Sequence, residues 1–203
     1  MGASVFPPQA PPDAAAFMIR HRVAIGVSVV VQTQYVAAGH VLTEASGQWT
    51  LFDGVTRTRY LVDRAARVLR RLDPPEVLAQ VRALRATLGE PHVSLAGSGI
   101  PMRGHLCRRY ILHVTHPRLS ASTDAYVTTV PALAGTALHA ARLLSQEALP
   151  FSPPLDPADL VVQSSIVLLQ QQREVRQTVT LEALEAASAN ALLDECLAFR
   201  ITI

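Results

Sequence analysis

The sequence contains no lysine and only one asparagine, Asn190, so all 18 of its basic side chains are arginines. This bias is typical of a GC-rich genome. A nucleic-acid-binding surface concentrates positive charge on one face, whereas these arginines are spread along the chain and the net charge is only +2. The densest group comprises Arg64, Arg67, Arg70 and Arg71, and we interpret it as a solvated strand edge that discourages edge pairing. We expect no nucleic-acid partner.

The chain also lacks a long hydrophobic run. A helix needs roughly 18–20 apolar residues to cross a bilayer, and the most apolar stretch, residues 23–31, is shorter and contains Gly26 and Ser28. Residues 1–16 are rich in proline and alanine and lack the basic segment and apolar core of a signal peptide. We expect residues 1–17 to be a disordered or draped lead-in. Two origins stay open: a cytoplasmic protein, and a processed or recloned form of an exported one.

Metal, cofactor and catalytic signatures are absent as well. The sequence has seven histidines but no His-x-x-x-His on a predicted helix and no Cys-x-x-Cys. His113 and His116 point to opposite faces of a strand, and His105 shares a face with His113 at about 26 Å along it. Residues 97–99, Gly-Ser-Gly, lack the context of a nucleophile elbow or phosphate loop, so we interpret them as a flexible turn. We expect no metal, no cofactor and no enzymatic activity.

Cysteine is scarce: Cys107 and Cys196 are the only two, and both fall on predicted strands. They can form a disulfide if their strands lie close enough, and such a bridge would contribute about 4–5 kcal/mol in the chain-entropy model. The alternative is two buried free thiols. A catalytic cysteine is not indicated, because no nearby histidine or helix start is present to lower its pKa.

What the sequence does contain is a strong strand pattern. Residues 21–35 alternate almost perfectly between apolar and other side chains, with one apolar face made of Val23, Ile25, Val27, Val29, Val31 and Tyr35. A period of two over that length predicts one long strand with one face buried. Further strand-like runs follow at residues 36–44, 48–52, 56–62 and 67–72, and Asp53-Gly54 between two of them is a strong hairpin signal. Residues 18–72 therefore predict an antiparallel meander.

The rest of the chain mixes two helices with more strands. Residues 74–88 are predicted to be helical, with Asp73 as a cap and Gly89 as the stop. A second helix is predicted over residues 132–149. Strands are predicted at residues 93–96, 104–115, 123–130, 160–170, 172–181 and 195–203. Runs of strands separated by isolated helices favour an α+β class with a single antiparallel sheet, which we expect to be one domain over residues 18–203.

Four local patterns recur in one known family. They are Asp53-Gly54 followed by residues 59–63, the strand at 104–110, the segment 126–131 that ends at a proline, and the closing segment 194–199. In their order and spacing the chain resembles the LolA/LolB-like lipoprotein-carrier superfamily, and in particular a branch of bacterial exported proteins. The sequence departs from the family at Tyr126, where tryptophan is more usual, and after Phe199, where a proline is missing.

The resemblance implies a curved antiparallel sheet, a half-open barrel, with two or so helices on its concave side and an apolar cavity between them. It also implies a periplasmic or otherwise extracytoplasmic location, and it brings no catalytic residues. A curved sheet facing amphipathic helices can leave space for acyl chains, whereas the alternative is an ordinary close-packed core. The candidate lining residues are Val27, Val29, Val31, Trp49, Leu51, Tyr110, Leu112, Leu138 and Leu168.

Two functions follow as expectations. The first is a non-enzymatic binding protein for an apolar small molecule, lipid or acyl chain, with helices at residues 74–88 and 134–144 acting as a lid. The second is an accessory or structural subunit of a larger, membrane-associated protein complex, with the proline-rich segments 6–12 and 150–157 draped over protein partners.

Overall fold

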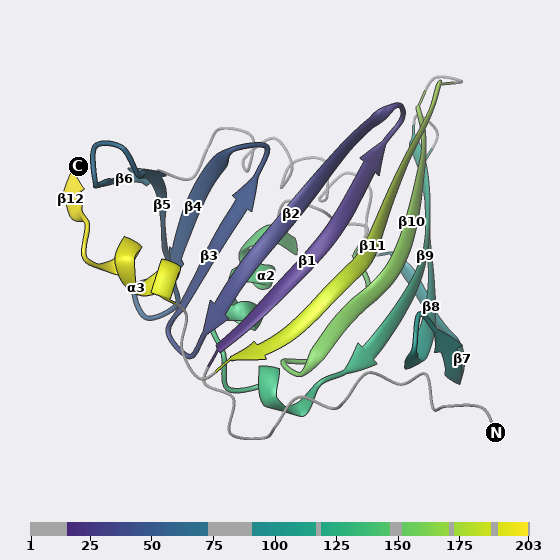
Figure 1. Ribbon diagram of the computed structural model, residues 1–203. Helices are drawn as coiled ribbons and strands as arrows, with labels where there is room; N and C mark the ends of the chain where they lie inside the picture. Colours follow the sequence, from purple (N-terminus) through teal and green to yellow (C-terminus); the bar gives the residue numbers. More distant parts are fainter. Residues whose placement is uncertain are drawn as a thin grey trace.

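The computed structural model describes residues 16–72, 91–116, 119–146, 152–170, 173–187 and 191–202. Most of the predicted lead-in and the whole predicted helix at residues 74–88 lie outside these ranges. Within them, twelve strands form one sheet in the order β12-β6-β5-β4-β3-β2-β1-β11-β10-β9-β8-β7. The sheet bends into a deep trough whose two edges, β12 and β7, do not pair with each other (Figure 1).

The first six strands form the predicted meander: β1 (Ala16–Ile25), β2 (Ser28–Ala37), β3 (His40–Ala45), β4 (Gln48–Asp53), β5 (Thr58–Asp63) and β6 (Val68–Leu72). The later elements are β7 (His92–Met102), β8 (His105–His116), β9 (Leu119–Thr129), the 3-10 helix η1 (Pro131–Leu133), α2 (Leu138–Gln146), β10 (Asp159–Gln170), β11 (Arg173–Ala187), α3 (Ala191–Leu197) and β12 (Arg200–Thr202). β11 pairs with β1, which joins the two halves of the sheet. The ladders are antiparallel except for β12 with β6, which is parallel.

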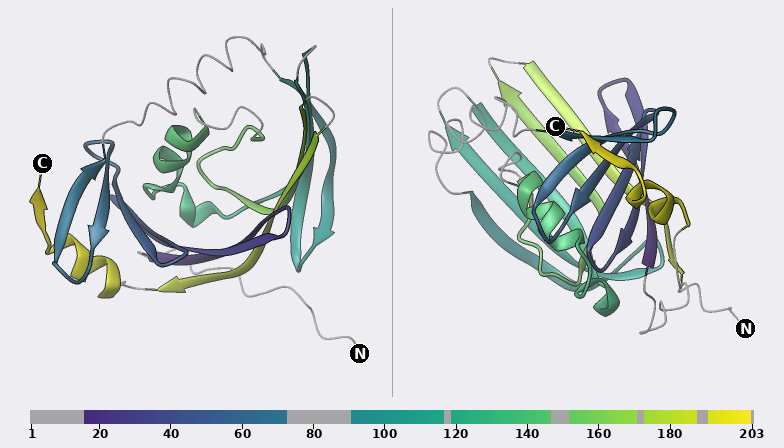
Figure 2. Two further views of the ribbon diagram at one scale, coloured as in Figure 1. Left: turned by 90° about the horizontal axis from the view of Figure 1, so that it is seen from above. Right: turned by 90° about the vertical axis from the view of Figure 1, so that its left-hand side faces the viewer.

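The structure confirms a curved, open, largely antiparallel sheet and corrects the balance between sheet and helix. Beside twelve strands, the described residues form two α-helices and one 3-10 turn, so the fold is mostly β and the α+β label fits it only loosely. α2 lies in the hollow of the trough, as expected, while α3 lies outside it (Figure 2). The strand predicted at 195–203 is instead the end of α3 followed by the short β12.

The predicted single strand over residues 21–35 is two strands joined by a tight hairpin. β1 ends at Ile25 and β2 begins at Ser28, and Gly26 has a φ of +58° in the turn between them. Two-residue hairpin turns require a positive φ at their first central position, which glycine adopts without steric cost. Because the chain reverses there, Val23 pairs with Val30, and Val29 lies on the other face.

The predicted hairpin at Asp53-Gly54 is confirmed. The Asp53 carboxylate accepts hydrogen bonds from the backbone N–H of Val55 at 2.8 Å and from the Thr56 hydroxyl at 2.8 Å, which closes the turn. A Cβ at Gly54 would lie 3.0 Å from the Cβ of Ala137. The absence of a side chain at Gly54 therefore allows the chain just before α2 to approach the sheet.

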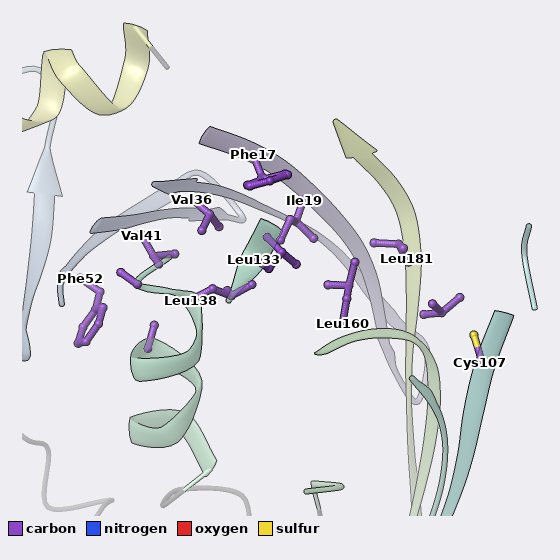
Figure 3. Packing of buried hydrophobic residues seen from close by; sticks show 13 residues of the cluster. Phe17, Ile19, Val36, Val41, Phe52, Cys107, Leu133, Leu138, Leu160 and Leu181 are labelled. Atoms are coloured by element: carbon purple, nitrogen blue, oxygen red, sulfur yellow. The ribbon is translucent and has the colours of Figure 1, made fainter. Parts of the chain in front are cut away.

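Two apolar clusters lie on opposite faces of the sheet. Neighbouring residues of a strand point to opposite faces, and accordingly Val41 belongs to one cluster and Leu42 to the other. The first cluster fills the space between the concave face and α2, and Figure 3 shows its residues gathered around Leu133 and Leu138. The second packs α3 against β3, β4, β5 and β6 on the convex face through Leu193, Cys196 and Phe199.

Candidate functional site: the concave face of the sheet

The concave face can be followed across the sheet through its pairing register. Paired residues point to the same face, so Val30 and Val23 share the face of Phe17 and Val36, which belong to the cluster beneath α2. From Val23 the row continues through Val179, Ser164, Ala125, Tyr110 and Leu95, on β11, β10, β9, β8 and β7. The concave face is therefore one continuous surface from β2 to the edge strand β7.

Away from α2, this face keeps large aliphatic side chains accessible. Ile25 is 48% exposed, Val175 46%, Val93 39% and Leu95 58%. We call these four, with their partly buried neighbours, the apolar wall; the neighbours are Val23, Val30, Tyr110, Leu168 and Val179. Single exposed apolar residues are ordinary, whereas several on one face make that face a candidate binding surface. Here Gln177, which pairs with Ile25, lies among them.

The structure divides the nine predicted lining residues between three places. Tyr110, Leu112 and Leu168 lie on the concave face, and Leu138 of α2 is fully buried against it. Of the other five, Val27 is fully exposed in the β1–β2 turn, and Val29 and Val31 are on the convex face. Trp49 and Leu51 belong to the cluster with α3, and Leu51 also contributes to the lining of the pocket described below.

The hairpin at Gly26 explains the largest part of that difference. A two-residue turn shifts the alternation by one position, so the apolar residues before and after it point to opposite faces. Sequence reasoning missed Val93, Leu95 and Val175, although a signal was present. Val93 and Leu95 alternate with Ser94, and Val175, Val179 and Leu181 fall on one face of their strand, interrupted by Gln177.

At the end nearer α2, the concave face contains a pocket of about 140 Å³. Strands β2 to β5 and helix α2 contribute its lining, which is Gln32, Gln34, Val41, Thr43, Thr50, Leu51, Phe52, Arg59, Ala141 and Arg142. Most of these side chains are polar, so this pocket differs in character from the expected apolar cavity. Among the described residues, the lining includes two arginines and no carboxylate.

The two arginines connect the sheet to α2. The Nη2 of Arg59 donates a hydrogen bond to the carbonyl of Ala141 at 3.2 Å, and Arg142 donates to the carbonyl of Asp159. Burial lowers the pKa of Arg59. Burial also lowers the pKa of Arg142, to about 10, against the opposing charge of Asp159. Both guanidinium groups remain positively charged at neutral pH.

The carboxylate of Asp159 is buried and paired with another arginine. It accepts hydrogen bonds from Arg108, from the Thr129 hydroxyl at 3.1 Å and from the backbone N–H of Asp156 at 3.0 Å. A buried charge is tolerated when it is paired and hydrogen-bonded. These contacts hold the start of β10 against β8 and β9, and the contact of Arg142 with the Asp159 carbonyl adds α2 to the same group.

His21 lies beside the pocket, where it pairs with Gln32 across β1 and β2. Its ring Nε2 donates a hydrogen bond to the carbonyl of Val161 at 3.0 Å. Burial lowers the pKa of His21, the bond to Val161 opposes this, and the charge of Arg142 lowers it further. The neutral imidazole is therefore the favoured form in the folded protein.

The two cysteines are free thiols in separate clusters. Cys107 of β8 is buried in the first cluster, and Cys196 of α3 is buried in the second. In the sheet order, β8 is six positions from β3, the nearest strand that packs against α3, so the disulfide alternative is not formed in this structure. Burial raises the pKa of Cys107 to about 11 and also raises that of Cys196.

The described residues contain no group of three or more His, Cys, Asp or Glu placed to hold a metal ion. In the same part of the chain, no helix is both long enough and apolar enough to cross a membrane.

Comparison with known proteins finds a likeness among solved structures. No protein-family model and no curated protein matches the sequence. The chain is similar to a crystal structure from Vibrio parahaemolyticus that is described as an outer membrane lipoprotein-sorting protein domain. The match covers 89% of each chain with 8% sequence identity and a TM-score of 0.36. A score this low reports only a loose likeness of overall form.

Proposed function

We propose that this protein is a non-enzymatic, extracytoplasmic binding protein that holds an apolar ligand, a lipid or an acyl chain, against the apolar wall. The observation that supports the proposal is the exposure of Ile25, Val93, Leu95 and Val175 on one face of a curved sheet. Covering such side chains is favourable by about 25 cal/mol for each Å² of apolar surface removed from water. The extracytoplasmic location is proposed from the sequence resemblance.

The ligand is bound and released in this proposal without any covalent step. In this proposal the ligand lies on the concave side of the trough. Helix α2, which lies in the hollow of the trough (Figure 2), limits the space at one end of the concave face. Movement of α2 as a lid would require breaking the hydrogen bonds from Arg59 to Ala141 and from Arg142 to Asp159. The second lid helix predicted from the sequence lies outside the described residues.

A matched pair of substitutions tests which face binds the ligand. Val175 and Leu169 are each 46% exposed and belong to neighbouring strands of one hairpin, but Val175 is on the concave face and Leu169 on the convex face. Val175→Asp places a charge where the acyl chain would lie, so we expect binding of a fluorescent lipid to weaken by at least about tenfold. Leu169→Asp should stay within about twofold of the original chain. Equal losses in the two variants would contradict the concave site.

Native mass spectrometry of protein purified gently from its own cells tests the same proposal without a chosen probe. A carrier should show extra mass that is lost on denaturation and that is extractable into organic solvent. A clean apo mass, with no uptake of lipid from vesicles, would contradict the proposal.

A second candidate function is the accessory subunit of a protein complex, and one observation favours it. The β1–β2 hairpin exposes apolar side chains on the convex face as well, with Val27 at its tip, Val29 50% exposed and Val31 43% exposed. We infer that a protein partner would bind there. Val29→Asp should then release the partner while lipid binding continues, as measured by co-purification and by probe fluorescence.

A further inference from the structure

Two histidines lie opposite each other on the strands β7 and β8. His92 is the first residue of β7, and its pairing partner on β8 is His113. Paired residues of an antiparallel ladder point to the same face, with their Cβ atoms about 4.5–5.5 Å apart. Sequence spacing alone suggested no metal ligand beside His113, because only the β7–β8 register brings His92 to it.

This histidine pair lies on the convex face of the sheet, behind one end of the apolar wall. Consecutive residues of a strand point to opposite faces. His113 follows Leu112 of the concave face, and His92 precedes Val93 of the apolar wall. Leu112 and Val93 also pair with each other, so the sheet separates the two imidazoles from the proposed lipid site directly behind them.

Both histidines are accessible to an ion from solvent. His92 and His113 are each exposed, and the residue that pairs with His113 on its other side is the small Ser122 of β9. The ladder is regular at His92, since its first register shift comes after Leu95. The backbone therefore holds the two side chains at neighbouring positions and leaves them open on the solvent side.

Two imidazoles at this separation suit a transition-metal ion. A histidine nitrogen binds Zn²⁺ at about 2.0–2.1 Å, so two such ligands of a tetrahedral ion lie roughly 3.3 Å apart. Side chains that start about 4.5–5.5 Å apart can converge to that distance. Imidazole suits Zn²⁺, Cu²⁺ and Ni²⁺, whereas Mg²⁺ and Ca²⁺ prefer oxygen ligands. A pair supplies fewer ligands than a closed structural zinc site, and the described residues contain no larger group, so water completes the coordination and binding is reversible.

We propose that His92 and His113 form a two-histidine site for a divalent transition-metal ion, Zn²⁺, Cu²⁺ or Ni²⁺. The bound ion links β7 to β8, and β7 is the last strand in the sheet order of the described residues. It thereby holds in place the strand that carries Val93 and Leu95 of the apolar wall. The metal site does not depend on the proposed lipid binding, because it uses the opposite face of the sheet.

Calorimetric titration with Cu²⁺, the ion expected to bind most tightly, tests the site at pH 7.5. His92→Gln and His113→Gln should each weaken the tightest binding by at least about tenfold, because each removes one of two ligands of the same ion. The matched control is His105→Gln, since His105 is also on β8 but pairs with Met102; it should stay within about twofold of the original chain. Single variants that bind Cu²⁺ as tightly as the original chain would overturn the proposal.

Nuclear magnetic resonance of the original chain gives a readout that needs no variant. Because Cu²⁺ is paramagnetic, a small fraction of one equivalent should broaden the ring signals of His92 and His113 together and before those of His105. Broadening of only one of the two, or of neither, would overturn the shared site. Zn²⁺ should also raise the melting temperature of the original chain, because it binds the folded state, and should raise it less in the double variant His92→Gln/His113→Gln. An equal rise in both proteins would place the stabilising ion elsewhere.

Discussion

The concave face contains two regions formed by the same strands. The side chains of one region are covered by the rest of the chain, and those of the other are accessible. Ile19 and Ile25 lie on the same face of β1, six residues apart, yet Ile19 is fully buried and Ile25 is 48% exposed. Ile19 belongs to the covered region, the part of the concave face packed against η1 and α2 together with Phe17 and Val36, whereas Ile25 belongs to the apolar wall. The same type of side chain on the same strand is thus part of the core at one position and accessible at the other.

Under the proposed function, a fold of this kind separates stability from binding along its strands. Residues in the covered region gain their burial energy in every molecule, because α2 and η1 are part of the chain. Residues of the apolar wall gain burial energy only when another molecule covers them. The polar pocket, with Arg59, Arg142 and Gln32, lies at the boundary between the two regions.

The largest expected change in stability comes from substituting one of the two isoleucines, and substitution of the other is the comparison. Ile19→Ala should lower the free energy of unfolding by about 2–5 kcal/mol, because it leaves a cavity in a closed cluster. Ile25→Ala should lower it by less than about 1 kcal/mol and should weaken lipid binding about fivefold. Urea denaturation and probe titration measure the two quantities. Similar losses of stability in both variants would contradict the division of the face.

A smaller loss of stability is expected from a substitution at the start of β10, where the contacts of Asp159 attach this strand to the covered region. Asp159→Asn keeps the shape but removes the charge that pairs with Arg108, and we expect a loss of about 2 kcal/mol in the free energy of unfolding. Asp124 is the control, since its pair with Arg109 is more than one-third exposed. Asp124→Asn should cost at most about 1 kcal/mol. Thermal denaturation of the two variants should rank them in this order.

The smallest effect concerns His21, which lies between Ile19 and Val23 at the boundary of the two regions. Its pKa is lowered in the folded protein by burial, whereas the unfolded chain has the ordinary value of about 6.5. The unfolded state therefore binds more protons below pH 6.5, and stability should fall as the pH drops, by at most about 1.4 kcal/mol for each pH unit. Above pH 6.5 this contribution is fully present. His21→Gln should flatten the dependence, measured as the difference between the two proteins from pH 5 to 8.

Local turn chemistry could be predicted from the sequence, and so could most strand positions. The Asp53-Gly54 hairpin follows from the ability of aspartate to bond the backbone N–H groups of its own turn. The hairpin at Gly26 was missed because it shifts an alternating pattern by a single residue and leaves no polar gap. α3 was missed because Ala191–Leu197 is a short segment, and its helix formers were outweighed by the expectation of a closing strand.

The candidate site could be predicted only in part, because strand alternation alone does not identify which face is covered. Tyr110, Leu112 and Leu168 lie on the concave face, and their role in lining a ligand cavity stays a prediction. Trp49 and Leu51 belong instead to the cluster with α3, although Leu51 also contributes to the pocket lining. Alternation identifies the two faces of a strand, but it does not say which of them a helix will cover. Here α3 covers the face that carries Leu51.

The amino-acid pattern alone therefore specified the period of the strands, the Asp53-Gly54 turn, and enough apolar residues to bury a face of the sheet, because these depend on neighbours within a few residues. Which apolar residues became core and which stayed accessible depended on where α2 and α3 came to lie. The polar pocket likewise exists only because Gln32, Thr50 and Arg142, far apart in sequence, meet on one face. Long-range packing creates such a site, and no local pattern records it.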